Sequence, residues 1–306
     1  FNILLKRTTE RFANGDEFFI IPDQELFKLP FEALVTGFNG SFQQEDVLFS
    51  EYRAAEYVMQ KYKVSYFFSL ADFLRNFFGP RDYPYTLAAF GHPLVPGPAA
   101  ASANLDQRGV GTIADVPSTR LEILNLEKLF AGSPRRIFLG ADFNRDNFCR
   151  FAPQAKFIHL ATHFFNDEKD PSRSAFLFSD SGKTRSLCDA RQILELRLRA
   201  ELVILSACES SEKNLMGFKL LSGVTAAIRQ TGVRDLIASL WPVDEFSSQI
   251  VPLFYREFLR GGGSANALRN AKLALFGKTI AIQDGARLSL AHPFLWANYV
   301  LYHFYR

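Results

Sequence analysis

The chain has 306 residues and a formal net charge of +3, from 35 Lys and Arg against 32 Asp and Glu. Hydrophobic residues make up 48% and charged residues 22% of it, which excludes intrinsic disorder and predicts about two domains or one large α/β unit. The charge is too balanced for a nucleic-acid-binding face, and the longest uncharged stretch, residues 86–105, is broken by Gly and Pro. Neither nucleic acid nor a membrane is therefore an expected partner.

Three cysteines, Cys149, Cys188 and Cys208, are widely spaced and form no CxxC pair. This spacing disfavours both a disulfide scaffold and a zinc site, and it favours a reducing, cytoplasmic location. The sequence begins with Phe1 rather than Met and shows no signal peptide. We therefore expect a fragment of a longer protein, with a regulatory domain or subunit outside this chain.

The first 82 residues are expected to form a small α/β part. Short apolar runs predict strands, Pro30 suits the start of a helical turn, and Ser69 suits a helix cap. The expected elements are strands at 18–21 and 64–68, a helical turn at 29–34, an amphipathic segment at 52–61 and a helix at 69–78. The segment 79–82 interrupts this pattern, so we expect a domain boundary after residue 82.

From residue 83 to residue 306, apolar runs alternate with helical segments. Strands are expected at 86–91, 136–139, 156–162, 201–207, 233–240 and 293–304, and a strand followed by a turn at 176–182. Helices are expected at 117–130, 144–151, 186–196, 218–230, 245–259 and 264–276. A loop rich in Pro and Ala should reach residue 116. Continuous apolar runs such as 156–162 and 201–207 are typical of strands buried on both faces. The alternation predicts an α/β fold with a mostly parallel sheet flanked by helices.

Two reactive side chains directly follow two of the buried strands. His163 follows the strand expected at 156–162, and Cys208 follows the strand expected at 201–207. Ligands of parallel sheets bind at the carboxyl ends of strands, so the thiol and the imidazole are expected to lie close together there. Such a pair can form a thiolate nucleophile, and the backbone N–H of Cys208 is a natural donor to an oxyanion.

Each of these residues alone is more typical of a structural role. His159, four residues before His163, would lie on the same face of a straight strand and is a second candidate for the base. Cys149 and Cys188 lie on expected helical segments without a partner at a strand end, so both are interpreted as structural.

Several motifs in order resemble a known family. Residues 157–163, 202–210 and 233–244 look like the CHAT domain, whose members are caspase-like cysteine peptidases of the caspase/separase group. The likeness extends to residues 21–23, 29–34, 254–258, 267–272 and 292–296, and so covers nearly the whole chain.

The resemblance implies that His163 is the general base and Cys208 the nucleophile of a dyad. It implies a caspase-like protease domain at 83–306, preceded by an N-terminal, pseudo-protease-like part at 1–82, and no metal or organic cofactor. It also implies a protease that is switched on by an attached sensor or repeat domain in bacterial signalling or defence. The predicted function is therefore that of a cysteine endopeptidase that cleaves a protein partner.

The sequence departs from the family pattern at two places. Phe164 stands where caspase-like sites usually have Gly, and residues 209–211 stand where many members have a turn that contains Gly. The backbone N–H groups of Phe164 and Cys208 are the expected oxyanion donors. Phe164 favours the alternative function, a catalytically inactive caspase-like scaffold that binds protein partners. A nucleotide-binding module is disfavoured because residues 261–263 lack the Lys-Ser/Thr of a phosphate loop.

Three carboxylates, Glu209, Asp244 and Glu245, are candidates for binding a Lys or Arg side chain of the substrate. Asp244 could instead cap the helix that follows it, and the many Phe and Leu residues allow an apolar pocket. The acidic residues after His163 are expected to form a solvated loop or, alternatively, a gate over the site. They are Asp167, Glu168 and Asp170.

Overall fold

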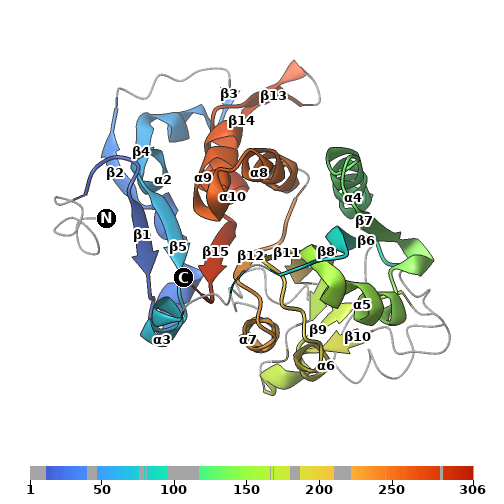
Figure 1. Cartoon of the computed structure of the whole chain (residues 1–306). Helices are drawn as coiled ribbons and strands as arrows, with labels where there is room; N and C mark the ends of the chain where they lie inside the picture. The colour runs from blue at the N-terminus through green and yellow to red at the C-terminus, as the bar shows by residue number, and fades with distance from the viewer. Residues whose placement is uncertain are drawn as a thin grey trace. The chain divides into compact units, whose positions relative to one another are not determined.

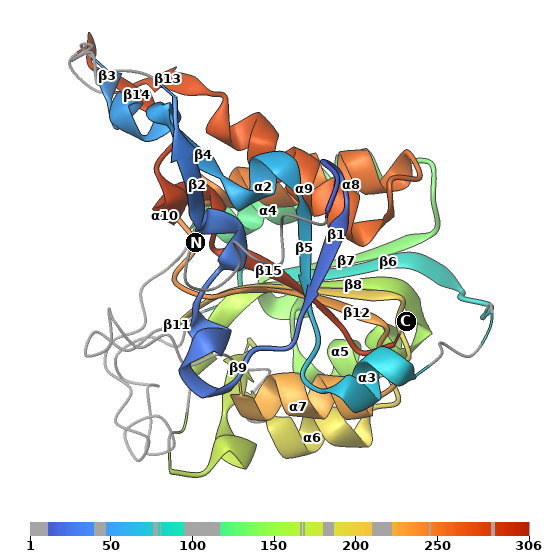
Figure 2. The same ribbon diagram turned by 90° about the vertical axis from the view of Figure 1, so that its left-hand side faces the viewer.

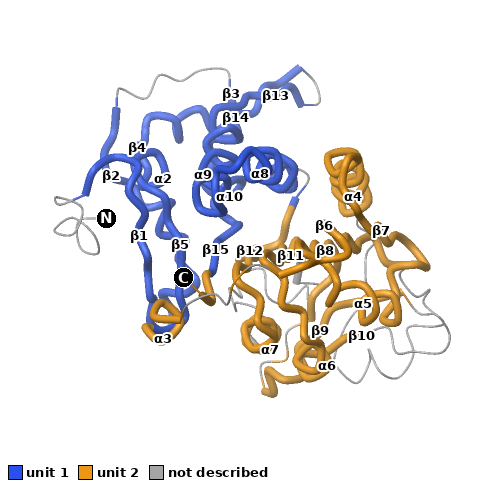
Figure 3. Tube along the Cα trace, viewed as in Figure 1, with its two compact units in different colours: residues 1–69, 244–302 blue, residues 70–243, 303–306 orange. Residues whose placement is uncertain are grey.

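The structure is a computed structural model that describes residues 12–39, 47–75, 79, 81–94, 117–165, 167, 169–179, 187–209, 222–244, 246–282 and 285–305. The chain forms two compact units, shown in Figure 3. Unit 1 contains residues 1–69 and 244–302, and unit 2 contains residues 70–243 and 303–306. The expected functional division after residue 82 stays a prediction, and the loop expected up to residue 116 lies outside the described residues from 95 onward.

Unit 2 is built on a parallel sheet (Figure 1). Its strands lie in the order β12-β11-β8-β6-β7, and each neighbouring pair is parallel. Their bounds are β6 (Tyr85–Gly91), β7 (Arg135–Leu139), β8 (Ala155–Phe165), β11 (Leu202–Glu209) and β12 (Asp235–Ser239). Two short strands, β9 (Ala175–Leu177) and β10 (Leu187–Asp189), continue antiparallel from the end of β8. The predicted mostly parallel α/β sheet is confirmed.

Helices cover both faces of this sheet (Figures 1 and 2). Helix α4 (Pro117–Leu129) packs on one face, against β6, β7 and β8. The other face carries α5 (Arg145–Phe151), α6 (Ala190–Glu195) and α7 (Ser222–Gln230). The unit also contains α3 (Leu70–Leu74) and the short 3₁₀ turns η5 (Gly140–Asp142), η6 (Ala152–Gln154) and η7 (Pro171–Arg173).

A glycine allows α4 to lie close to the sheet. A Cβ atom at Gly91 would lie 2.5 Å from Cγ1 of Ile123, a fully buried residue of α4, and 3.3 Å from the carbonyl oxygen of Ala161. Real atoms do not approach so closely, so any larger residue at position 91 would push α4 away from β6 and β8.

Unit 1 contains three groups of strands. β1 (Glu17–Ile20), β5 (Lys63–Tyr66) and β15 (Tyr299–His303) run parallel in that order. β2 (Val35–Phe38) pairs antiparallel with β4 (Ala55–Tyr57), and β14 (Arg287–Ser289) lies between β13 (Thr279–Ala281) and β3 (Val47–Leu48). The helices are α2 (Val58–Lys61), α8 (Ile250–Leu259), α9 (Gly263–Phe276) and α10 (Pro293–Trp296), with 3₁₀ turns η1 (Gln24–Lys28), η2 (Phe31–Ala33), η3 (Ser50–Ala54) and η8 (Ser247–Gln249).

A buried charged pair connects two segments of unit 1 that are far apart in sequence. Lys272 of α9 and Glu32 of η2 are 2% and 3% exposed, and the Lys272 ammonium donates to Glu32. The Tyr66 hydroxyl on β5 donates to the other carboxylate oxygen of Glu32 at 2.6 Å. Burial lowers the pKa of Lys272, and the charge of Glu32 opposes that shift. The pair thus joins residues 29–34 to residues 267–272.

Two of the elements that differ from those expected do so because of a helix cap. The helix expected at 186–196 begins at Ala190, because Asp189 forms a capping box with Gln192 while residues 187–189 pair with β9. The strand expected at 293–304 is shorter: Pro293 opens helix α10, the side chain of His292 caps it, and β15 begins at Tyr299. In both places a local cap determines where the helix lies.

Candidate active site

The pairing of β8 with β11 brings His163 and Cys208 to the same row of the sheet. Their Cα atoms are register partners, and the flanking pairs are Thr162 with Ala207 and Phe164 with Glu209. Register partners in a parallel pair lie roughly 4.8 Å apart and share a face of the sheet. His163 is 6% exposed. The structure does not describe the side chains of residues 207–209. The proximity of His163 and Cys208 is therefore established for their backbone positions.

Both strands run further than the sequence indicates. β8 ends at Phe165 and β11 at Glu209, so His163 and Cys208 lie within their strands rather than directly after them. The expectation that each follows its strand is wrong. The extension has a physical cause: Phe164 and Phe165 pair with Phe176 and Ala175 of β9.

Phe164 lies on the face of β8 opposite His163, because successive residues of a strand alternate between faces. It is 3% exposed, and its ring packs against Phe176 with centroids 5.6 Å apart. The bulk of this side chain is thus directed away from the face that carries His163. The roles of the Phe164 and Cys208 N–H groups as oxyanion donors stay predictions.

His159 lies on the same face as His163 but in another row. Its register partners are Ile204 on β11 and Ala89 on β6, four residues before the row of Cys208. It is fully buried, and its Nε2 lies 3.0 Å from Oε1 of Glu122 on α4. This position favours His163 over His159 as the histidine next to Cys208.

The acidic segment after β8 forms ordered turns. The Asp167 carboxylate accepts hydrogen bonds from the N–H groups of Lys169 and Asp170, and its other oxygen lies 3.4 Å from Nε of Arg173. Asp170 accepts from the N–H and hydroxyl of Ser172 and caps η7. These contacts support the solvated-loop interpretation for Asp167 and Asp170, and Glu168 lies outside the described residues.

The side chain of Asp244 closes the turn that leads into η8. Its Oδ1 accepts hydrogen bonds from the N–H of Phe246 at 2.9 Å, from the N–H of Ser247 at 2.6 Å and from the Ser247 hydroxyl at 2.9 Å. This oxygen is thereby occupied within its own turn, at the start of η8. Glu245 and the side chain of Glu209 lie outside the described residues, so their assignment to substrate binding stays a prediction.

The other two cysteines have the properties of structural residues. Cys188 on β10 is fully buried, and burial raises the pKa of its thiol far above the usual range. Cys149 on α5 is half-buried, and burial raises the pKa of its thiol as well. Because the thiolate is the nucleophilic form, both thiols should be poorly reactive at neutral pH.

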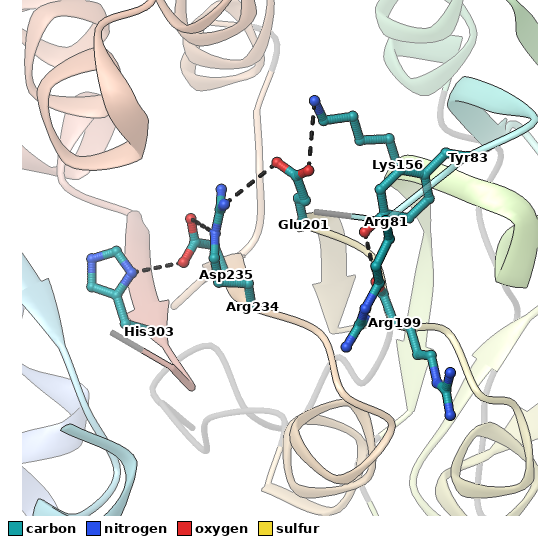
Figure 4. A network of polar contacts seen from close by, with 8 residues as sticks. All are labelled: Arg81, Tyr83, Lys156, Arg199, Glu201, Arg234, Asp235 and His303. Atoms are coloured by element: carbon teal, nitrogen blue, oxygen red, sulfur yellow. Dashed lines mark hydrogen bonds and ion pairs between the residues drawn. The ribbon is translucent and has the colours of Figure 1, made fainter. Parts of the chain in front are cut away.

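A network of ion pairs holds the amino ends of the strands, away from the row of His163 and Cys208 (Figure 4). Glu201, just before β11, lies 3.5 Å from Lys156 of β8 and 3.4 Å from Arg234. Asp235 of β12 lies 2.7 Å from Nδ1 of His303. The carbonyl oxygen of Arg199 accepts hydrogen bonds from Arg81 and Tyr83. These ion pairs and hydrogen bonds stabilise the amino ends of β8, β11 and β12.

Two residues near the row were missed by the sequence analysis. They are Glu122 on α4 and Ser206 on β11, which form a hydrogen bond with each other. Helical spacing places Glu122 on one stripe of α4 with Thr119, Ile123 and Leu126, and the structure shows that this stripe is buried. Leu121, an apolar residue of the same helix, is instead 64% exposed.

The described residues lack both a metal-binding cluster and a membrane-spanning helix. They contain no group of three or more His, Cys, Asp and Glu side chains that could hold a metal ion. Among the same residues, no helix has the length and apolarity that crossing a membrane requires.

Comparison with known proteins gives one family. A family model described as "CHAT domain" matches residues 1–303. Among solved structures, the Arg-specific cysteine proteinase gingipain R matches with 10% sequence identity and a TM-score of 0.42, over 80% of this chain and 55% of that one. This chain thus spans about half of that structure's length, and a likeness this low supports no transfer of activity. No curated protein matches the chain significantly.

Proposed function

The chain belongs to the CHAT domain family, and from that premise we propose that it is a cysteine endopeptidase that cleaves a protein partner through His163 and Cys208. The observation that carries the proposal is the register of β8 and β11, which pairs these two positions directly. Family membership supports the peptidase class, and the register supports the choice of residues. Control by an attached sensor or repeat domain, and a role in bacterial signalling or defence, remain parts of this proposal.

The reaction follows from the chemistry of the two groups. His163 takes the proton of the Cys208 thiol, and the thiolate attacks the carbonyl carbon of the peptide bond. The backbone N–H groups of Phe164 and Cys208 stabilise the resulting oxyanion. The C–N bond breaks as the His163 imidazolium gives its proton to the leaving amine, which leaves a thioester. Water, deprotonated by His163, then attacks the thioester, and the sulfur leaves as the thiolate with the imidazolium restored.

Acidic residues are proposed to take part in substrate recognition. Glu209, the last residue of β11, is proposed to contact residues next to the cleaved bond from the end of the strand. One oxygen of Asp244 is occupied by hydrogen bonds within its own turn, so its contribution to binding a cationic side chain rests on the other oxygen. Glu245 completes the proposed set.

A covalent probe tests the proposal without a known substrate. We expect a mixture of peptide acyloxymethyl ketones to alkylate Cys208, because the warhead reacts with an activated thiolate held beside a peptide-binding site. Tandem mass spectrometry maps the adduct, and Cys149, whose thiol pKa is raised by burial, serves as the internal control.

Two outcomes separate the peptidase from the inactive scaffold, the alternative that Phe164 favours. An adduct on Cys208 that disappears when His163 is replaced by alanine supports the dyad. Absence of an adduct, or equal slow labelling of Cys149 and Cys208, would contradict the peptidase and leave a protein-binding scaffold.

A further inference from the structure

One buried carboxylate connects helix α4 to both strands of the proposed dyad. Oε1 of Glu122 lies 3.0 Å from Nε2 of His159 on β8, and Oε2 accepts a hydrogen bond of 3.0 Å from the hydroxyl of Ser206 on β11. The contact with His159 has the distance of an ion pair without the alignment of a hydrogen bond. Glu122, His159 and Ser206 are 4%, 0% and 3% exposed.

Along β8 and β11, these contacts come shortly before the row of His163 and Cys208. Ser206 comes two residues before Cys208, and His159 comes four residues before His163. Even steps along a strand keep one face, so all four positions share the face of the sheet that α4 covers. Ser206 and Cys208 are separated by roughly 7 Å along the strand, at about 3.3 Å per residue. The carboxylate therefore contacts β11 two residues, and β8 four residues, before the row that would carry the chemistry.

The small residues around Glu122 indicate why the carboxylate can reach both strands. Ala161, the register partner of Ser206, has only a methyl group between His159 and His163 on this face. Gly91, the register partner of Ala161 on β6, lets α4 approach the sheet because a Cβ there would collide with Ile123. A buried carboxylate without partners is strongly unfavourable. Burial of Glu122 is therefore tolerated only when the polar groups of both strands lie within contact distance of its carboxylate.

We propose that Glu122 is a positioning residue of the dyad, acting through His159 and Ser206. It fixes the position of β8 relative to β11, and the position of both strands relative to α4. It thereby determines how His163 and Cys208 are placed relative to each other. This inference rests on the proposed function, because it assigns a role within that reaction. A nucleophile and a base that are misplaced by about 1 Å can lose on the order of 10²-fold in rate.

The test compares variants by their reaction with the acyloxymethyl ketone probe that labels the wild type. Glu122→Ala should lower the maximal rate of inactivation by about 10- to 100-fold, with little change in the probe concentration for half-maximal rate. Glu122→Gln should recover most of the rate, because its amide can accept from Ser206 and donate to His159. Ser206→Ala should give a smaller loss, and its effect should not add to that of Glu122→Ala, since both act on one network.

Leu126→Ala is the matched control. Leu126 is a fully buried residue of α4 without a polar contact to either strand. We expect this variant to lower the melting temperature while the inactivation rate of the folded protein stays unchanged. If Glu122→Ala does not fold, Glu122→Gln and Ser206→Ala still carry the test.

The outcomes distinguish this inference from the function on which it rests. Wild-type rates in both Glu122→Ala and Ser206→Ala would overturn the positioning role while leaving the peptidase intact. An equal loss of rate in Leu126→Ala would also overturn it, because the effect would then follow from stability alone. A wild-type protein that the probe does not label at Cys208 would overturn the proposed function and this inference together.

Discussion

Replacing Cys208 with alanine is expected to abolish peptide-bond cleavage while the protein stays folded. Loss of a catalytic nucleophile typically costs on the order of 10⁶-fold in turnover, because no other group can form the thioester. The fold should persist, because the pairing of β11 with β8 and β12 is made by the backbone and extends over the strand from Leu202. Cleavage of a peptide library, followed by mass spectrometry, measures activity, and circular dichroism measures folding.

The matched control for this experiment is Cys149→Ala, which removes a half-buried thiol on α5 without touching the proposed dyad. This variant should cleave at the wild-type rate. His163→Ala should lower turnover by about 10²- to 10⁴-fold, the usual contribution of a general base. Cleavage that persists in purified Cys208→Ala would show that another residue is the nucleophile.

Replacing Lys272 with methionine is expected to destabilise the protein severely. The substitution leaves the carboxylate of Glu32 buried, with the Tyr66 hydroxyl still donating to it but no opposite charge beside it. Removing one partner of a buried ion pair typically costs about 3–5 kcal/mol, because a charge remains without compensation. The loss in the free energy of unfolding is measured from the midpoints of urea denaturation of the wild type and the variant, with one slope used for both transitions.

A second variant shows whether the uncompensated charge of Glu32 causes the loss of stability. In the double variant Lys272→Met with Glu32→Gln, a neutral amide oxygen can still accept from Tyr66 and no charge is buried. We expect it to recover most of the lost stability, because neutral replacements of buried ion pairs are often close to neutral in stability. If the double variant is as unstable as Lys272→Met alone, the packing of the lysine stem rather than its charge would be responsible.

Continuous apolar runs explain why much of the central sheet could be predicted. The runs at 156–162 and 201–207 correspond to β8 and β11, whose residues are buried on both faces. The neighbouring positions of His163 and Cys208 were also inferred from the rule that ligand sites lie at carboxyl ends. The register itself could not be derived, because periodicity identifies a face but not the partner in the next strand.

Elements that depend on contacts between distant segments were harder to predict. The ends of β8 and β11 were placed too early because their last residues are stabilised by pairing with β9 and with each other. Glu122 was overlooked because a glutamate on an apolar stripe is expected to face solvent unless another segment supplies its partners. Those partners, His159 and Ser206, come from two other strands.

The pH dependence of alkylation at Cys208, measured residue by residue with iodoacetamide in the wild type and in His163→Ala, tests the proposed dyad most directly. If the imidazole activates the thiol, Cys208 in the wild type reacts rapidly at mildly acidic pH, while Cys149 and Cys188 react slowly because burial raises the pKa of both thiols. In His163→Ala the profile of Cys208 shifts toward higher pH. Identical profiles for Cys208 in the two proteins, or slow reaction of all three cysteines in the wild type, would contradict the pairing of this thiol with His163.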